Sequence, residues 1–191
     1  MATEKRTDRS RRVILDAADA AFRELGFAET TVEEIAHHAG LTRKTAYNLF
    51  ESKEDIALRL IERIEAEPDA LYRARIEANE SVLSLLEKVL LDSAGWCLAN
   101  PSLARLALAP QRRPSLEPPA GRPSLQRLVV DILALGQRQG VIRRDEDPKL
   151  MALLLLGIYG QAMLTALAGG PFDASDIRRI IRLVVEGIGS L

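Results

Sequence analysis

The sequence predicts an all-α fold of about nine helices, and three observations support this prediction. The 191-residue chain is 47% hydrophobic but only 4% aromatic, and it is rich in the helix formers Ala, Leu, Arg and Glu. Apolar residues recur three or four positions apart, which is the spacing of one helix face. No run of alternating β-branched residues indicates a half-buried strand.

Caps and glycines mark the expected helices in the first third of the chain. A helix that begins near residue 9 should stop at Gly26. Thr31 and Glu34 have the spacing of a capping box, and Thr42 can cap the next helix. Pro68 either kinks or ends a fourth helix. The four expected helices cover about 9–25, 31–39, 42–49 and 52 onward.

The remainder of the chain is also predicted to be helical. Residues 110–123 hold five of the nine prolines and are expected to form a loop. Gly140 should end the helix that follows this loop, and Asp147 should cap the next one. The expected helices in this part cover about 82–98, 101–109, 124–139, 147–168 and 173 to the end of the chain.

One of these helices raises the question of a membrane span, because residues 151–170 include no charged residue. Gln161 and several glycines interrupt this stretch, and no anchoring aromatic residues stand on either side of it. We therefore expect no membrane contact and interpret the stretch as a helix buried by the chain and by a second subunit.

The two histidines could suggest a metal site. His37 and His38 are adjacent, so on a helix they point about 100° apart and cannot chelate one ion as an i, i+4 pair can. The single Cys97 excludes both a cysteine-based zinc site and an intramolecular disulfide. We expect neither a metal nor any other cofactor.

The stretch AHHAGLTRKTAYNLF instead predicts a helix-turn-helix. Ala36 is small where two helices must approach closely, and Gly40 sits where the chain must turn, with an expected positive φ. The apolar positions needed at a steep helix crossing are also present: Ile35, Ala39, Leu41, Ala46 and Leu49.

This geometry turns polar side chains outward on the helix over 42–49, where Arg, Lys and Asn can contact bases and hydroxyls can contact phosphates. Residues 1–12 add five basic residues against two acidic ones, although the whole chain has a net charge of −1. The candidate DNA-binding residues are Thr31, Thr42, Arg43, Lys44, Thr45, Tyr47, Asn48 and Lys53.

Residues 30–56 resemble the DNA-binding signature of the TetR family of transcriptional regulators. The residues that carry the resemblance are Gly40, Leu41, Thr42, Thr45, Tyr47, Phe50, Ser52 and Lys53. The resemblance implies a helix-turn-helix domain over 1–55 and a regulatory ligand-binding and dimerisation domain over 56–191. Lys44 departs from the family, where small residues are common, and Asn48 and Leu49 also differ from the usual residues. The operator sequence therefore cannot be inferred from relatives.

The expected function is a repressor that binds a palindromic operator as a homodimer and is released by a small, largely apolar effector. Alternatives are a ligand-promoted repressor or activator, or a helical small-molecule-binding protein without a DNA function. We expect no enzyme, because no nucleophile elbow or phosphate-cradling loop is present. No apolar segment follows the N-terminal charges, so no signal peptide is predicted and the cytoplasm is expected.

Two further sets of residues are predicted in the regulatory part. Amphipathic or adaptable side chains in a Leu-rich surround are candidates for the effector site: Tyr72, Trp96, Cys97, Tyr159, Gln161 and Met163. Apolar stripes on the last two helices are candidates for a four-helix dimer interface: Leu154, Gly157, Ile158, Ile177, Ile181, Val184, Val185 and Ile188.

Overall fold

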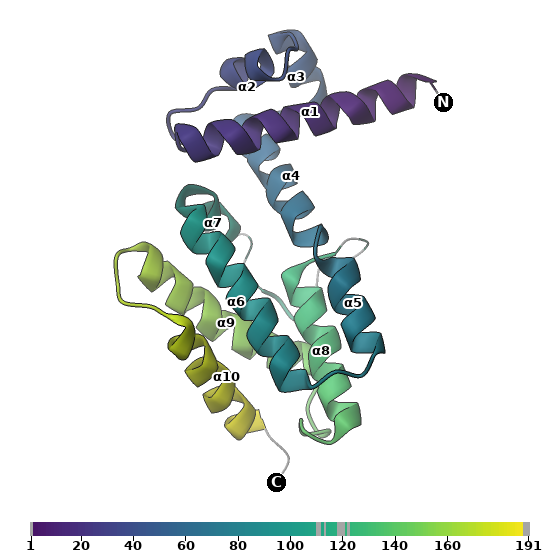
Figure 1. Cartoon of the computed structure of the whole chain (residues 1–191), viewed down its shortest axis with the longest axis vertical. Coiled ribbons are helices and arrows are strands. Elements are labelled where there is room, and N and C mark those ends of the chain that lie inside the picture. The colour runs from purple at the N-terminus through teal and green to yellow at the C-terminus, as the bar shows by residue number, and fades with distance from the viewer. Residues whose placement is uncertain (1, 110–111, 113, 118–120, 122, 189–191) are drawn as a thin grey trace. The chain divides into compact units, whose positions relative to one another are not determined.

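The computed structural model describes residues 2–109, 112, 114–117, 121 and 123–188, without the side chains of residues 2–5, 186 and 188. The described residues form ten α-helices and no β-strand, which confirms the predicted all-α class (Figure 1). The helices are α1 (Ala2–Glu24), α2 (Val32–His38), α3 (Arg43–Leu49), α4 (Lys53–Ala66), α5 (Asp69–Glu77), α6 (Val82–Ala99), α7 (Pro101–Ala107), α8 (Leu125–Gln139), α9 (Pro148–Leu167) and α10 (Ala174–Ile188).

Pro68 accounts for the additional helix. The proline lacks a backbone N–H and therefore cannot continue α4, but it can precede the first turn of α5. It occupies the N-cap of α5, and the backbone N–H of Tyr72 donates to its carbonyl. The sequence left open whether Pro68 kinks or ends the fourth helix. In the structure α4 ends, at Ala66.

The chain divides into two compact units. The first runs to Ile64 and also takes Ser102–Ala107, and the second holds Glu65–Pro101 and the chain from Leu108 onward. The domain boundary expected at 55/56 falls within α4. In the structure, α4 up to Ile64 belongs to the same unit as the helix-turn-helix.

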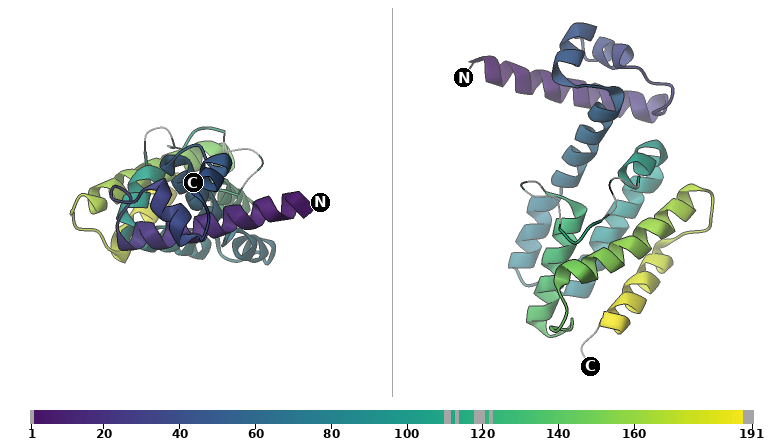
Figure 2. Two further views of the ribbon diagram at one scale, coloured as in Figure 1. Left: turned by 90° about the horizontal axis from the view of Figure 1, so that it is seen from above. Right: turned by 180° about the vertical axis from the view of Figure 1, so that it is seen from behind.

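In the first unit, α1 packs against both α2 and α3, and the further views show these three helices together (Figure 2). Amphipathic spacing along α1 explains this packing, because positions 14, 18, 21 and 22 fall on one face. Ile14 and Ala18 on α1 are fully buried, as are Ile35 on α2 and Ala46 on α3. This small core sets the angle between the two short helices.

In the second unit, α6, α8 and α9 contact one another, α10 packs on α6 and α9, and α5 packs on α8. The core consists mainly of leucine and isoleucine. Gly136 on α8 permits a close approach, since a Cβ there would lie 2.5 Å from a side-chain carbon of Ile142 and 2.9 Å from one of Val82. The largest fully buried side chains of this unit include Leu85, Leu86, Leu90, Ile132, Leu133 and Leu135.

α9 is the one described helix that is long and apolar enough to cross a membrane, with a mean hydropathy of 1.9. Core helices pass the same test. Met151, Ala152, Leu155 and Met163 of α9 are buried, and the helix contacts α6, α8 and α10. These contacts account for the buried face of α9, whereas Leu154 and Ile158 on its other face are each 50% exposed.

The apolar stripe of α10 lies differently from what its sequence suggests. Ile177, Ile181 and Val184 are at most 7% exposed, because this face packs against α6 and α9 of the same chain. These three residues, expected at the dimer interface, are thus already covered within the chain. Val185 is half-buried, and the side chain of Ile188 lies outside the described residues. The exposed apolar side chains of the two helices are instead Leu150, Leu154, Ile158 and Leu183.

Candidate nucleic-acid interface

The turn between α2 and α3 is built around Gly40. Its φ is +64°, a left-handed conformation that glycine adopts without steric cost, and the predicted positive φ is confirmed. The N–H of Leu41 donates to the carbonyl of Ala36 at 2.9 Å, which closes the end of α2. Ala36 is fully buried, as expected where the two helices meet.

The capping box at the start of α2 forms as predicted. The Thr31 hydroxyl oxygen accepts from the N–H of Glu34 at 3.2 Å, and the Glu34 carboxylate accepts from the Thr31 N–H at 2.7 Å. The Thr31 hydroxyl also donates to this carboxylate at 2.8 Å. These bonds from Thr31 lower the pKa of Glu34. Thr31 is an exposed residue at the N-cap of α2, and these bonds show that it fixes the start of this helix.

Thr42 caps α3 in a similar way. Its hydroxyl oxygen accepts from the N–H of Thr45 at 3.1 Å, and the two hydroxyl oxygens lie 2.9 Å apart. Ala46 is fully buried and Phe50 is 5% exposed, so this side of α3 faces the core. Leu49, expected in the core, is half-buried.

The free face of α3 carries two stripes of side chains. Arg43 forms an ion pair with Glu33 of α2, with Nε 2.7 Å from Oε1, and its guanidinium lies 5.3 Å from the centre of the Tyr47 ring. Lys44 and Asn48 form the second stripe and are exposed. Neither has a hydrogen bond or ion pair with another described residue. The polar side chains predicted to face outward therefore do so.

Lys53, at the start of α4, is already engaged within the protein. Its ammonium group donates to the carbonyl oxygens of Phe27 at 2.7 Å and Ala28 at 3.1 Å, and it lies 4.6 Å from the centre of the Phe27 ring. No sequence pattern indicates this contact, because the partners lie 26 and 25 positions away. Lys53 thereby ties α4 to the segment that joins α1 to α2.

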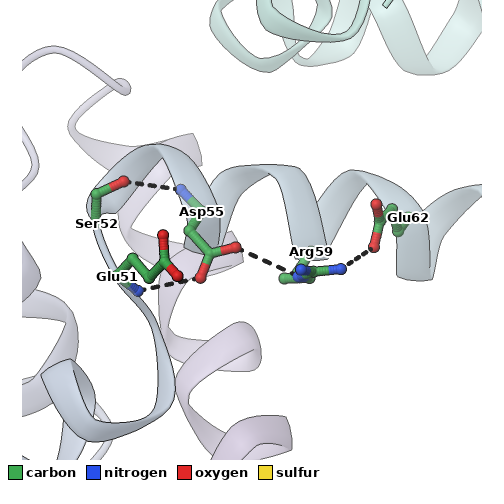
Figure 3. A network of polar contacts seen from close by, with 5 residues as sticks. All are labelled: Glu51, Ser52, Asp55, Arg59 and Glu62. Atoms are coloured by element: carbon green, nitrogen blue, oxygen red, sulfur yellow. Dashed lines mark hydrogen bonds and ion pairs between the residues drawn. The ribbon is translucent and has the colours of Figure 1, made fainter.

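Polar contacts also fix the first turns of α4 (Figure 3). The Ser52 hydroxyl accepts from the N–H of Asp55 at 3.1 Å, and the Asp55 carboxylate accepts from the N–H of Glu51 at 3.1 Å. Arg59 joins Asp55 to Glu62 on the next turn. The helix expected from about residue 52 onward thus begins at Lys53, and these bonds fix its first turns.

The histidines and the basic arm lie at the surface. His38 has Nδ1 2.8 Å from the carbonyl oxygen of Glu34, within the α2 helix itself. Among the described residues, no group of three or more His, Cys, Asp or Glu side chains is placed to hold a metal ion. The arginines of the arm lie on the first turns of α1 and are exposed: Arg6, Arg9, Arg11 and Arg12.

Three of the candidate effector residues lie at or next to two neighbouring polar residues of α6, Asp92 and Ser93. The Tyr159 hydroxyl on α9 donates to Ser93 at 2.9 Å, and Cys97 lies next to the same serine. Burial raises the pKa of the Cys97 thiol to about 11. The Tyr72 hydroxyl donates to the neighbouring Asp92 at 2.6 Å.

The other candidate effector residues do not share one environment. Met163 is fully buried and Trp96 is half-buried, whereas Gln161 is exposed on α9. Sequence reasoning missed Asp92 and Ser93, because their polar side chains lie on an otherwise apolar helix and carry no motif.

Known proteins share both the sequence pattern and the fold. Residues 14–60 match the family model described as bacterial regulatory proteins, tetR family. The transcriptional regulator TtgR of Pseudomonas putida is 33% identical over 91 residues, 47% of this chain and 43% of TtgR. The chain therefore aligns with less than half the length of that relative. The transcriptional repressor KstR2 of Mycobacterium tuberculosis is 28% identical over 185 residues, 92% of this chain and 90% of KstR2.

A solved structure resembles the chain over almost its full length. The TetR-family repressor FadR of Thermus thermophilus, in complex with lauroyl-CoA, has a TM-score of 0.73 and is 26% identical. The match covers 93% of this chain and 94% of that protein. The arrangement of helices described above, and not only the helix-turn-helix, is therefore shared with a known regulator.

Proposed function

The chain belongs to the TetR family of bacterial transcriptional regulators, and we propose that it is a ligand-responsive repressor that binds operator DNA through α3. The helix-turn-helix supports this most strongly. Gly40 and the buried residues of α2 and α3 hold the second helix so that Lys44, Tyr47 and Asn48 face outward. A helix presented in this way fits the major groove of DNA.

Phosphate contacts surround this helix in the proposed complex. The exposed arginines on the first turns of α1 supply positive charge, and the hydroxyls of Thr45 and Tyr47 can donate to phosphate oxygens. Such contacts give affinity without sequence preference and weaken as salt rises. The residues proposed to form the DNA-binding surface, either by contacting DNA or by holding the contacting helices in place, remain Thr31, Thr42, Arg43, Lys44, Thr45, Tyr47, Asn48 and Lys53.

A second copy of the chain is the proposed partner of α9 and α10. Leu154 and Ile158 are each 50% exposed one turn apart on α9, and Leu183 on α10 is 63% exposed. Gly157 lies between them, and a Cβ at this position would meet no atom within 4 Å, so the glycine leaves room for close approach. The two helices and their copies would form a four-helix interface that covers these side chains.

The proposed effector is a small and largely apolar molecule bound by the second unit. Its helices are rich in leucine, and the hydroxyls of Tyr72 and Tyr159 provide polar groups for orientation. Because Thermus thermophilus FadR forms a complex with lauroyl-CoA, the first probes to test are a fatty acid, which is small and largely apolar, and its acyl-CoA, which adds a large anionic group. If the effector releases DNA, linkage requires that it bind the free protein more tightly than the DNA-bound protein.

Selection from a library of random duplexes tests this function. We expect recovery of a near-palindrome whose half-sites are about one helical turn, roughly 34–36 Å, or a multiple of it apart. The double variant Lys44→Ala, Asn48→Ala should recover no common sequence while retaining its circular dichroism spectrum. A parent protein that bound no duplex, or all duplexes equally, would remove the proposed function. Cytoplasmic localisation follows if the operator is chromosomal.

A further inference from the structure

We infer that this chain reads the operator sequence through Lys44 and Asn48, while Arg43 and Lys53 position the helices. Each half-site should then contain a guanine within two base pairs of an adenine. This inference rests on the proposed DNA-binding function. It follows from a difference among the basic side chains on and near α3. Arg43 and Lys53 are engaged, which means that they already contact other groups of the protein, whereas Lys44 has no hydrogen bond or ion pair with another described residue.

Arg43 is the first of the engaged cations. Its guanidinium pairs with Glu33 of α2 and lies over the Tyr47 ring, so three side chains hold one another across the two helices. To reach a base, Arg43 would have to leave both contacts and expose the Glu33 carboxylate to the phosphates. The pairing instead fixes the ring of Tyr47 and joins α3 to α2.

Lys53 is the second engaged cation. Two carbonyl oxygens and an aromatic ring hold its ammonium group on the segment between α1 and α2. The side chain is half-buried, so it loses these contacts if it extends toward DNA. Its role is therefore to set the position of α4, not to read bases.

Lys44 and Asn48 differ from both. Each is exposed, and neither has a hydrogen bond or ion pair with another described residue, so their polar groups are available without breaking a contact. They are four positions apart, which places them on one side of α3 about 6 Å apart along the helix axis. Because successive base pairs are separated by about 3.4 Å, the two side chains reach bases no more than two pairs apart.

The hydrogen-bonding chemistry of the Lys44 ammonium and the Asn48 amide indicates which bases they bind. A lysine ammonium is a donor without an acceptor, and guanine presents two acceptors, O6 and N7, in the major groove. An asparagine amide both donates and accepts, which matches N7 and the N6 amino group of adenine. The half-site should therefore contain these two bases at the spacing set by α3.

Parallel selections from random duplexes with the parent and a set of single variants test this inference. We expect Lys44→Ala to lose the guanine preference by about tenfold and Asn48→Ala to lose the adenine preference, each at one position. Lys44→Arg should keep the guanine, since arginine donates to the same two acceptors. Arg43→Ala should bind all duplexes more weakly but select the same bases as the parent. Arg23→Ala, which removes an exposed cation of α1 that pairs with Asp19, controls for net charge.

The outcomes separate the inference from the proposed function. If Lys44→Ala selected the parent's bases, or if Arg43→Ala lost a base preference, the inference would be overturned while operator binding stood. If the parent selected no sequence at all, the proposed function would fail first. Circular dichroism and thermal unfolding of every variant establish that lost preferences do not reflect lost folding.

Discussion

The two units of the chain are stabilised by different means. In the first, α2 and α3 have seven residues each, too few to be stable alone, and caps at Thr31 and Thr42 fix where they begin. In the second, α6, α8 and α9 have 18, 15 and 20 residues and are held mainly by buried leucine and isoleucine. Local polar bonds thus fix where the short helices of the first unit begin, whereas buried apolar side chains hold the long helices of the second unit.

The few polar groups inside the second unit fit this contrast. The hydroxyls of Tyr72 and Tyr159 both have partners on α6, and no buried side-chain nitrogen or oxygen in the described residues lacks a partner. These bonds join residues 20 and 66 positions apart, whereas the bonds of Thr31 and Thr42 join residues three positions apart. Substitutions in the two units should therefore have separable effects.

The largest expected effect comes from breaking the proposed dimer in the second unit without changing the first. Leu154→Glu with Ile158→Glu places two charges on exposed positions of α9, so the fold should survive while association is lost. A monomer contacts one half-site only, and operator affinity should fall by at least about 100-fold, or about 2.7 kcal/mol. Light scattering and fluorescence anisotropy measure the two effects.

Leu71→Glu is the matched control for this variant, because Leu71 is 63% exposed on α5 and lies outside the proposed interface. It should leave both mass and affinity unchanged. A dimer that survived the double substitution would exclude this face of α9 as the interface.

The next expected effect tests the packing of the second unit. Gly136→Ala introduces a Cβ into atoms of Ile142 and Val82, and overpacking of this kind should cost about 1–3 kcal/mol in the free energy of unfolding. Gly95→Ala on α6 meets no atom within 4 Å and should instead stabilise by about 0.5–1 kcal/mol. Denaturant unfolding compares the two, and equal effects would contradict the close approach of α8.

A smaller effect is expected from the cap of α2. Thr31→Ala removes both hydroxyl bonds to Glu34 and should destabilise by about 1 kcal/mol. Hydrogen exchange of the α2 amides should accelerate, while the amides of α8 and α9 keep their protection. Thr165→Ala, within α9, removes only a bond to the preceding turn and should be nearly neutral. Faster exchange in both units would mean that they are not separately stabilised.

The smallest effect concerns pH and the Cys97 thiol. Burial raises its pKa to about 11, so the folded state favours the neutral thiol more than the unfolded state, where the pKa is about 8.5. The resulting stability is complete below about pH 8.5 and is lost as the pH rises toward 11. The difference in unfolding free energy between the parent and Cys97→Ala should shift across this window. A constant difference would show that the thiol is not desolvated.

The same contrast explains what could be predicted from the sequence. The capping box at Thr31, the cap at Thr42 and the positive φ of Gly40 depend on residues within a few positions, so the pattern alone predicts them. The pairing of Arg43 with Glu33, the contact of Lys53 with Phe27 and the burial of Ile181 depend on tertiary packing. Periodicity identifies an apolar face, but it does not say which neighbour covers that face.

The salt dependence of DNA affinity tests the central claim most directly. Anisotropy titrations of the parent with its selected duplex and a scrambled duplex, from about 50 to 200 mM salt, measure both charge contacts and specificity. We expect both affinities to fall steeply and linearly on logarithmic axes, with the selected duplex bound at least about 1,000-fold more tightly throughout. Equal affinities for the two duplexes, or affinity unchanged by salt, would contradict the assignment of α3 as a DNA-reading helix.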